Sequence, residues 1–284
     1  MTRMLAAAVI VIVSIGLFAS TRLLAQSGGA TGGATTHPTR PVDRATAPRK
    51  LLVLMMTAAV RHESIETAKD VLKRLGSGSG AFEPTIVEDT SHFDRDKLMA
   101  FDAVMFCNTT GELPLSDAQK QNLLDFVAGG RGFVGVHSAT DTFYQWPAYG
   151  ELIGAYFDNH PWGAKDTVTL KVEQPDHPIT LPFGPRPFEL TEEIYQFKAP
   201  YERSKLNVLM RLDTTKTDMT KQGIKRTDGD FPVAWTKPHG GGRVFYTALG
   251  HNKSIWNDPR FQAHLLAGII WAADANPPRP SAPP

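Results

Sequence analysis

The apolar positions from Lys50 onward fall into short continuous runs that alternate with stretches of helical spacing. The run "KLLVLMMT" has the continuity of a parallel strand covered on both faces, and three further predicted strands follow it: "FEPTIVED", "FDAVMFCN" and "GFVGV". Between them, residues 62–76 and 115–130 repeat apolar side chains at helical intervals, and each predicted helix ends at glycine, the second being capped by Ser116. The pattern predicts an α/β domain whose mostly parallel sheet is doubly wound, with helices on both faces.

The second half of the chain has a different pattern of apolar and polar residues. Residues 147–157 predict another helix and residues 258–274 a closing helix, while the strands expected between them are "TVTLKVEQ", "LNVLMRLD", "FPVAWTK" and "GRVFYTALG". A Pro-rich stretch up to Tyr201 lacks periodicity and predicts a long irregular excursion. We expect these later strands to extend the same sheet.

The two ends of the chain predict targeting and linker segments rather than fold. Residues 1–25 combine a positive charge, an apolar run and a small-residue cleavage site, which is the pattern of a secretory signal. Residues 26–49 form a Gly-, Thr- and Pro-rich disordered linker, and 276–284 a Pro-rich tail, so the domain is expected over 50–275. The predicted location is periplasmic or secreted, with membrane attachment only if the signal stays uncleaved.

Composition narrows the classes of partner. The formal net charge of +1 leaves no excess of cations for phosphates, which argues against nucleic-acid binding. The single cysteine, Cys107, excludes an intramolecular disulfide and ends an apolar run, which favours a buried structural thiol. Expected partners are a small carbohydrate substrate and, as an open alternative, further copies of the chain in a homo-oligomer.

Candidate chemistry gathers where predicted strands end. In an open parallel sheet, ligands bind beyond the carboxyl ends of the strands. Arg61 and His62 follow the first strand, His137 follows "GFVGV", and His251 follows the last strand. His62 as a helix-start residue, and His137 and His251 as residues that merely close strands, are the competing structural interpretations.

Carboxylates and further side chains complete the candidate set. Glu193 is preferred over Glu192 as the inward acid, because adjacent acids mostly face opposite ways. His137 and Glu193 are the candidate catalytic pair, as general acid and base. The candidate substrate-binding residues are Arg61, which is suited to holding an oxyanion, Asp141, which could bind a hydroxyl or orient His137, and Tyr144, His160 and Trp256.

A divalent metal such as zinc is the candidate cofactor. His62, His137 and His251, with a carboxylate, have the ligand chemistry for it, although no HxxxH, HxH or CxxC spacing supports the set. "GVHSA" lacks the second glycine of the G-x-S-x-G elbow and places Ser138 one residue late, which disfavours a serine hydrolase. "GGRG" precedes a strand rather than following one, which disfavours a dinucleotide-binding site.

Several motifs together resemble the trehalose-utilisation (ThuA-like) family, which is similar in fold to class I glutamine amidotransferases. The matching stretches run in order along the body of the chain: "RHES", "GGRGFVGVHSATDTFY", "GAYFDNHPWG", "DHPIT", "EEIYQF", "PVAWTKPHGGGRVFYTALGHNKSIW" and "GIIWAA". The resemblance implies a flavodoxin-like sheet with a site at the turn after "GFVGV". Those amidotransferases place a catalytic cysteine at this turn, where the chain has His137, so glutamine hydrolysis through a thioester is excluded.

The leading hypothesis is an exported enzyme that acts on a carbohydrate by hydrolysis, elimination or isomerisation. The resemblance links it to disaccharide metabolism and suggests a keto-glycoside as substrate. The alternatives are a non-catalytic carbohydrate-binding or scaffolding module on the same fold, and a metal-dependent hydrolase with a non-sugar substrate.

Overall fold

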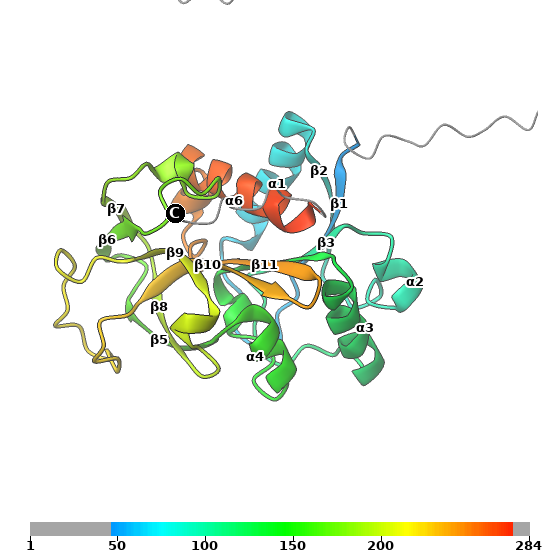
Figure 1. Cartoon of the computed structure of the whole chain (residues 1–284), viewed down its shortest axis with the longest axis horizontal. Helices are drawn as coiled ribbons and strands as arrows, with labels where there is room; N and C mark the ends of the chain where they lie inside the picture. The colour runs from blue at the N-terminus through cyan, green and yellow to red at the C-terminus, as the bar shows by residue number, and fades with distance from the viewer. Residues whose placement is uncertain (1–46, 275–284) are drawn as a thin grey trace, which may run out of the picture. The chain divides into compact units, whose positions relative to one another are not determined.

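The computed structural model of the chain describes residues 47–274 (Figure 1). The predicted signal, the tail after residue 275 and nearly all of the predicted linker lie outside the described residues. The first strand begins at Arg49, one residue inside the segment predicted as linker. Within residues 47–274, no helix combines the length and apolar character that crossing a membrane requires.

A nine-stranded mixed sheet forms the centre of the domain. Its order is β2-β1-β3-β4-β11-β10-β9-β6-β7. The first five strands in this order are parallel, and they are β2 (Phe82–Val87), β1 (Arg49–Leu54), β3 (Ala103–Cys107), β4 (Gly132–Val136) and β11 (Gly242–Thr247). The other four are antiparallel, and they are β10 (Pro232–His239), β9 (Asn207–Leu212), β6 (Thr167–Val172) and β7 (Phe188–Thr191). The predicted α/β fold is confirmed, with half of the sheet parallel and half antiparallel.

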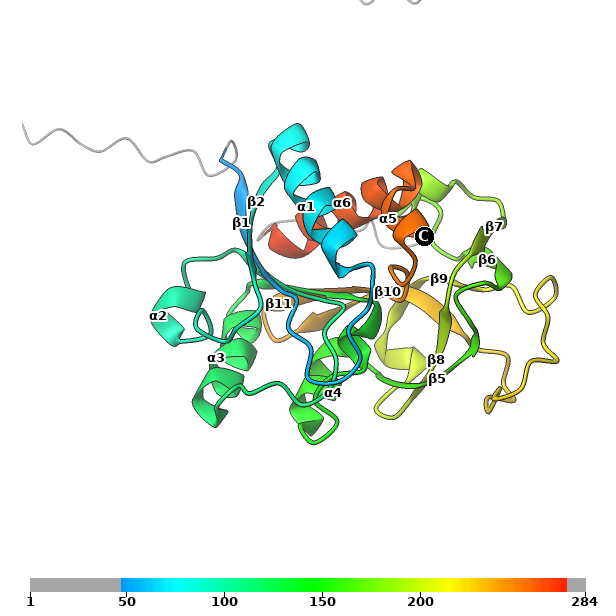
Figure 2. The same cartoon turned by 180° about the vertical axis from the view of Figure 1, so that it is seen from behind.

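Helices cover both faces of the parallel half. On one face lie α1 (Ile65–Ser79), α5 (Lys253–Trp256) and α6 (Pro259–Ala273), and on the other α2 (Arg95–Leu98), α3 (Asp117–Ala128) and α4 (Pro147–Ile153) (Figures 1 and 2). Helix α3 begins at a reciprocal capping box in which Ser116 and Gln119 satisfy each other's backbone N–H groups, as the sequence predicted for Ser116. Burial on both faces explains why β3 and β4 are apolar throughout, whereas the edge strand β2 is only partly buried and carries Glu83 and Thr85.

Two predicted helix ends were wrong. Helix α1 does not stop at Gly76 but continues to Ser79, where Gly80 adopts a left-handed φ of 64°. Gly76 is present because a Cβ there would lie 2.7 Å from the carbonyl oxygen of Phe82 on β2. Helix α4 ends at Ile153, before the left-handed Gly154.

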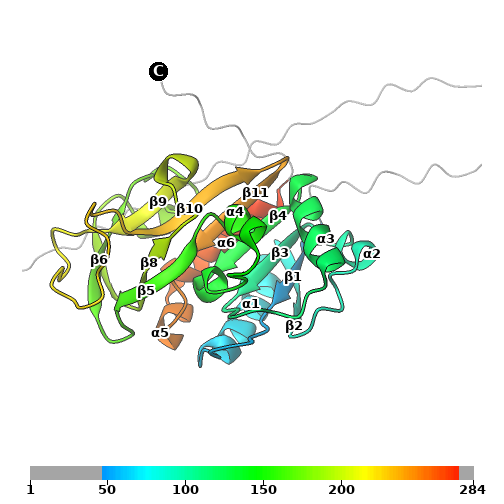
Figure 3. The same ribbon diagram turned by 90° about the horizontal axis from the view of Figure 1, so that it is seen from below.

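The residues after Gly154 form a strand instead of helix or turn. Strand β5 (Tyr156–Trp162) pairs antiparallel with β8 (Ile194–Lys198) in a separate two-stranded ribbon, which runs beside β10 (Figure 3). The predicted irregular excursion therefore contains β7 and β8, whose short lengths and proline neighbours weakened their sequence pattern.

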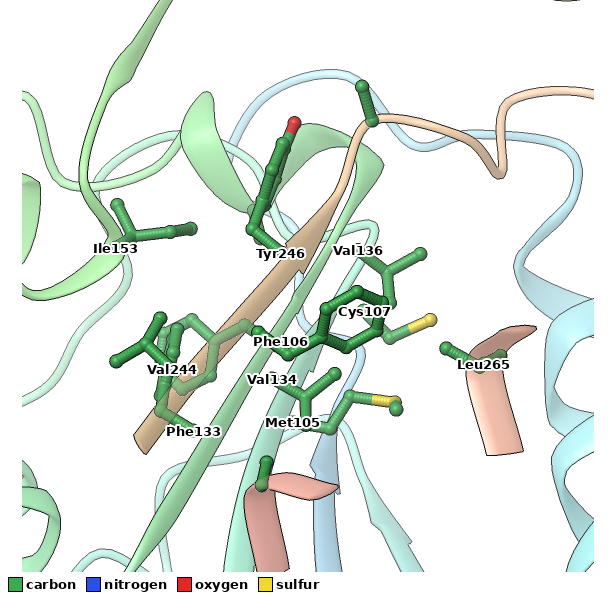
Figure 4. Packing of buried hydrophobic residues seen from close by; sticks show 14 of the residues in the cluster. Met105, Phe106, Cys107, Phe133, Val134, Val136, Ile153, Val244, Tyr246 and Leu265 are labelled. Carbon is green, nitrogen blue, oxygen red and sulfur yellow. The ribbon is translucent and has the colours of Figure 1, made fainter. Parts of the chain in front are cut away.

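The core lies between the sheet and its helices. Figure 4 shows side chains of β3, β4 and β11 packed together, with Ile153 of α4 on one side and Leu265 of α6 on the other. Cys107 belongs to this core, and burial raises the pKa of its thiol well above the ordinary value. The buried structural role predicted for this cysteine is confirmed.

Candidate functional site

Four potential ligand side chains converge beyond the carboxyl ends of the parallel strands. His62 comes from the loop after β1, His137 directly follows β4, His251 lies in the loop after β11, and Glu193 joins β7 to β8. One ligand atom from each lies within 4.8 Å of the others. The three histidines were predicted as ligands at this edge and Glu193 as the catalytic partner of His137, and the structure places Glu193 among the ligand atoms.

His137 is fixed at a sharp turn. Its backbone has a φ of 51°, a left-handed conformation that costs a non-glycine residue energy and is held by its surroundings. Tyr246 donates a hydrogen bond of 2.7 Å to the His137 carbonyl oxygen. The His137 ring is fully buried, and its Nδ1–H donates to the Ala248 carbonyl oxygen at 2.8 Å.

The Nδ1 atoms of the other two imidazoles also have partners. His62 Nδ1 lies 3.4 Å from the Ser138 hydroxyl. His251 Nδ1 lies 3.3 Å from Asn252 Oδ1, which acts as the acceptor because the Asn252 amide nitrogen already donates to two carbonyl groups. With Nδ1 engaged in each ring, all three Nε2 atoms point into the cluster, and this is how protein scaffolds orient histidines that bind metals.

Burial favours the neutral form of two of these imidazoles, those of His62 and His137. It lowers the pKa of His62 to about 4, with repulsion from the neighbouring histidines as a smaller cause. The pKa of His137 is lowered for the same reasons. A neutral ring carries an Nε2 lone pair, which is the form that a metal ion requires. On His137 this lone pair accepts a hydrogen bond of 2.9 Å from the Tyr195 hydroxyl, which a metal would have to replace.

Glu193 closes the cluster. Its Oε1 lies 3.6 Å from His137 Nε2, and its Oε2 lies 3.5 Å from both His251 Nε2 and His160 Nδ1. Burial raises the pKa of this carboxyl, and the surrounding histidines oppose the shift. Glu192 faces away from the cluster, so the choice of Glu193 as the inward acid agrees with the observed geometry.

The donor set fits a divalent cation. For Zn–N bonds of about 2.0–2.1 Å, the edge of a tetrahedron of ligands measures about 3.4 Å. The Nε2 atoms of His62 and His137 are 3.2 Å apart. Glu193 Oε1 lies 3.6 Å from His137 Nε2, Glu193 Oε2 lies 3.5 Å from His251 Nε2, and all four ligand atoms lie within 4.8 Å of one another. Three imidazoles and one carboxyl group at these separations suit zinc and similar metals.

A cavity of about 580 Å³ opens above the cluster. Among the predicted substrate-binding residues, Arg61, Asp141 and His160 line it. Burial raises the pKa of Asp141, whose carboxylate accepts a 2.6 Å hydrogen bond from the Tyr144 hydroxyl. Asp141 does not orient His137, since the Ala248 carbonyl does so, and Tyr144 lies behind Asp141 rather than in the wall of the cavity.

Two predicted contacts differ from expectation. Arg61 is held by Glu88 at 3.0 Å and Glu66 at 2.9 Å, so its guanidinium is engaged by neighbouring acids rather than presented to an oxyanion. Trp256 is buried and absent from the cavity wall, and its indole N–H donates to the Gly250 carbonyl oxygen at 2.9 Å. Aromatic residues in a sequence do not reveal which of them are covered.

Sequence reasoning missed the roles of several residues around the cluster. The Tyr195 hydroxyl lies 2.9 Å from His137 Nε2, and Phe157 lines the cavity. Tyr195 follows Glu193 by two positions, the spacing that places strand residues on one face, and this was the available signal. Asn252, Glu192 and Gly250 gave no signal, because their roles depend on contacts between distant segments.

These features define a class: an α/β protein of flavodoxin-like fold with a histidine-rich site at the carboxyl edge of its sheet. The chain belongs to the ThuA family, described as trehalose utilisation, whose sequence profile matches residues 50–272. That family is part of the class I glutamine amidotransferase-like superfamily.

Solved structures agree with this assignment. A ThuA-like protein from Bacteroides uniformis is 26% identical, with a TM-score of 0.66 over 82% of this chain and 95% of that one. A ThuA-like protein from Parabacteroides merdae is 20% identical, with a TM-score of 0.60 over 80% and 90% of the two chains. Cytoplasmic protein STM3548 from Salmonella typhimurium is 9% identical, with a TM-score of 0.56 over 79% and 98%. No curated protein matches the chain.

Proposed function

We propose that this protein is an exported enzyme that processes a carbohydrate with the help of a bound divalent metal ion. The observation that carries the proposal is the convergence of three oriented Nε2 atoms and the Glu193 carboxylate at the floor of a cavity. The secretory pattern of residues 1–25 supports a periplasmic or secreted location.

His62, His137, His251 and Glu193 would hold the metal. Bound there, a divalent ion would supply Lewis-acid polarisation of a substrate oxygen or a more acidic bound water. Glu193 therefore serves as a ligand in this proposal, rather than as the free acid or base that the sequence suggested.

Other side chains suit the remaining tasks. His160 is exposed at the cavity and lies 3.5 Å from Glu193, which places an imidazole where it can exchange protons with solvent. Asp141 offers a carboxyl group to a substrate hydroxyl, and Phe157 offers an apolar ring to a sugar face. A keto-glycoside combines a carbonyl for polarisation with hydroxyls for these contacts.

The test begins with the metal content of the purified protein by mass spectrometry, for the parent and for His137→Ala. We expect about one zinc or manganese per chain in the parent and loss of most of it in the variant. His239→Ala is the matched control, because His239 ends β10 at the opposite edge of the sheet and should leave metal content unchanged.

Activity is then measured on a panel of keto-glycosides and unmodified disaccharides, with and without a chelator. Metal-dependent turnover that His137→Ala abolishes supports the enzyme. Binding of sugars without turnover would instead establish the carbohydrate-binding module, and a metal-loaded protein inert towards every sugar would favour a non-sugar substrate. A parent free of metal after growth and dialysis in zinc would overturn the metal part of the proposal.

A further inference from the structure

A single peptide unit connects the loops that carry the ligands. The Gly250 carbonyl oxygen accepts three hydrogen bonds, from Ser64 Oγ at 3.0 Å, Asn108 Nδ2 at 3.1 Å and Trp256 Nε1 at 2.9 Å. Ser64 is two residues from His62, and Gly250 directly precedes His251. The loops after β1, β3 and β11 are therefore joined beneath the cluster.

A buried carboxylate holds the same loop from the other side. Glu192 accepts the backbone N–H of Gly250 at 3.1 Å and of Asn252 at 3.1 Å, and also the N–H of His251 between them. The Glu192 side chain is fully buried, and among residues 47–274 no cation pairs with it in a salt bridge. Burial raises the pKa of this carboxyl to about 8, and the three converging N–H groups of a backbone nest oppose the shift.

The geometry of this loop requires glycine. Gly250 has a φ of 124°, and a Cβ there would lie 3.1 Å from Val136 Cγ1 and 3.6 Å from His137 Cβ. The loop can therefore approach the turn of His137 closely enough to bring the His251 ring to the cluster.

We infer that Glu192 is a positioning residue that fixes His251, and its hydrogen-bond partner Asn252, relative to Glu193 and thereby preorganises the metal site. Glu192 and Glu193 are consecutive, so one peptide link connects the acid that holds the His251 loop to the acid in the cluster. This inference rests on the proposed function, because it concerns the assembly of the same site.

The substitution Glu192→Gln tests the inference with little change in volume. Oε1 accepts the N–H groups of Gly250 and His251, whereas Oε2 accepts only that of Asn252. An amide nitrogen in place of Oε2 cannot accept the Asn252 N–H, so the loop loses this part of its support. We expect zinc affinity, measured against a competing chelator, to fall by about 10–100-fold, the usual cost of removing a partner that orients a metal ligand. The absorption spectrum of the cobalt-substituted protein should change as well, since it reports ligand geometry.

Glu189→Gln is the matched control, because Glu189 is an exposed acid on the neighbouring strand β7. Glu192→Asp keeps a carboxylate and should recover part of the affinity. Circular dichroism and thermal melting without metal confirm that each variant is folded. If Glu192→Gln does not fold, the zinc affinity of Glu192→Asp tests the inference by the same criterion.

The possible results separate the two proposals. A parent that binds neither zinc nor cobalt removes the proposed metal function and this inference with it. In the other case the parent binds zinc, and a folded variant at position 192 has a zinc affinity within twofold of the parent's and an unchanged cobalt spectrum. That result overturns the inference but leaves the proposed metal site intact.

Discussion

At the scale of single residues, burial decides what each histidine can do. His137, His62 and His251 share a cluster in which every Nδ1 has a partner and every Nε2 faces the centre. His264 on α6 is buried too, but its Nδ1–H donates to the Ile179 carbonyl oxygen at 2.8 Å, and within residues 47–274 its Nε2 has no hydrogen-bond partner. The same residue type therefore builds a site in one place and supports packing in another.

The stability of the protein should depend on the titration of His264. Burial lowers its pKa to about 4, whereas an unfolded histidine titrates near about 6.5. The unfolded state thus binds the proton more readily. The contribution of His264 to the free energy of unfolding should therefore be constant above about pH 6.5 and be lost as pH drops towards about 4. The contribution of one such group is on the order of 3 kcal/mol.

Urea denaturation at pH 7 and pH 4.5 measures this effect in the parent and in His264→Gln. We expect the variant to lose less stability between the two pH values, while His92→Gln, outside the core, keeps the parental loss. Equal losses in parent and His264→Gln would show that His264 does not contribute.

At the scale of elements, the distance between a helix and the strand beside it decides which helix positions can carry a side chain. Gly76 and Gly78 both lie in the last turns of α1, yet a Cβ at Gly76 would meet the Phe82 carbonyl oxygen at 2.7 Å, and one at Gly78 would meet nothing within 4 Å. The two glycines are equivalent in the sequence pattern but not in packing.

This difference predicts opposite effects of alanine. Gly78→Ala should stabilise the protein by about 0.5–1 kcal/mol, through the better helix propensity of alanine. Gly76→Ala should destabilise it by about 1–3 kcal/mol, because the helix must move away from β2. Paired urea denaturation curves give both values, and a stabilising Gly76→Ala would contradict the packing argument.

At the scale of the whole molecule, the site joins the two halves of the sheet. The parallel half positions the three histidines at its carboxyl edge, and the antiparallel half supplies Glu193 between β7 and β8. A ligand that binds all four should therefore stabilise the domain as a unit.

Metal removal provides the corresponding prediction. A ligand that binds only the folded state, at 100 times its dissociation constant, adds about 2.7 kcal/mol to the free energy of unfolding. We expect the chelator-treated parent to melt at a lower temperature than the zinc-loaded parent, whereas His137→Ala should melt at the same temperature in both conditions. If the melting temperature of the parent is the same with and without zinc, the result would argue against the metal site.

The sequence by itself determined the α/β class, the parallel strands and the edge at which His62, His137 and His251 meet. These follow from local periodicity, and from the rule that parallel strands direct their carboxyl ends to one edge. The sequence also indicated that at most one of Glu192 and Glu193 would point inward, because adjacent acids mostly face opposite ways, and Glu193 was preferred.

Only the tertiary structure decided the rest. Four features depend on contacts between segments far apart in the chain. They are the pairing of β5 with β8, the salt bridges of Arg61, the burial of Trp256, and the hydrogen bonds that Glu192 accepts from the Gly250 loop. Local periodicity reports which face of an element is apolar, but not which distant residue will lie against it. Long-range packing therefore determines how the site is assembled, whereas the local sequence pattern was enough to identify its three histidines.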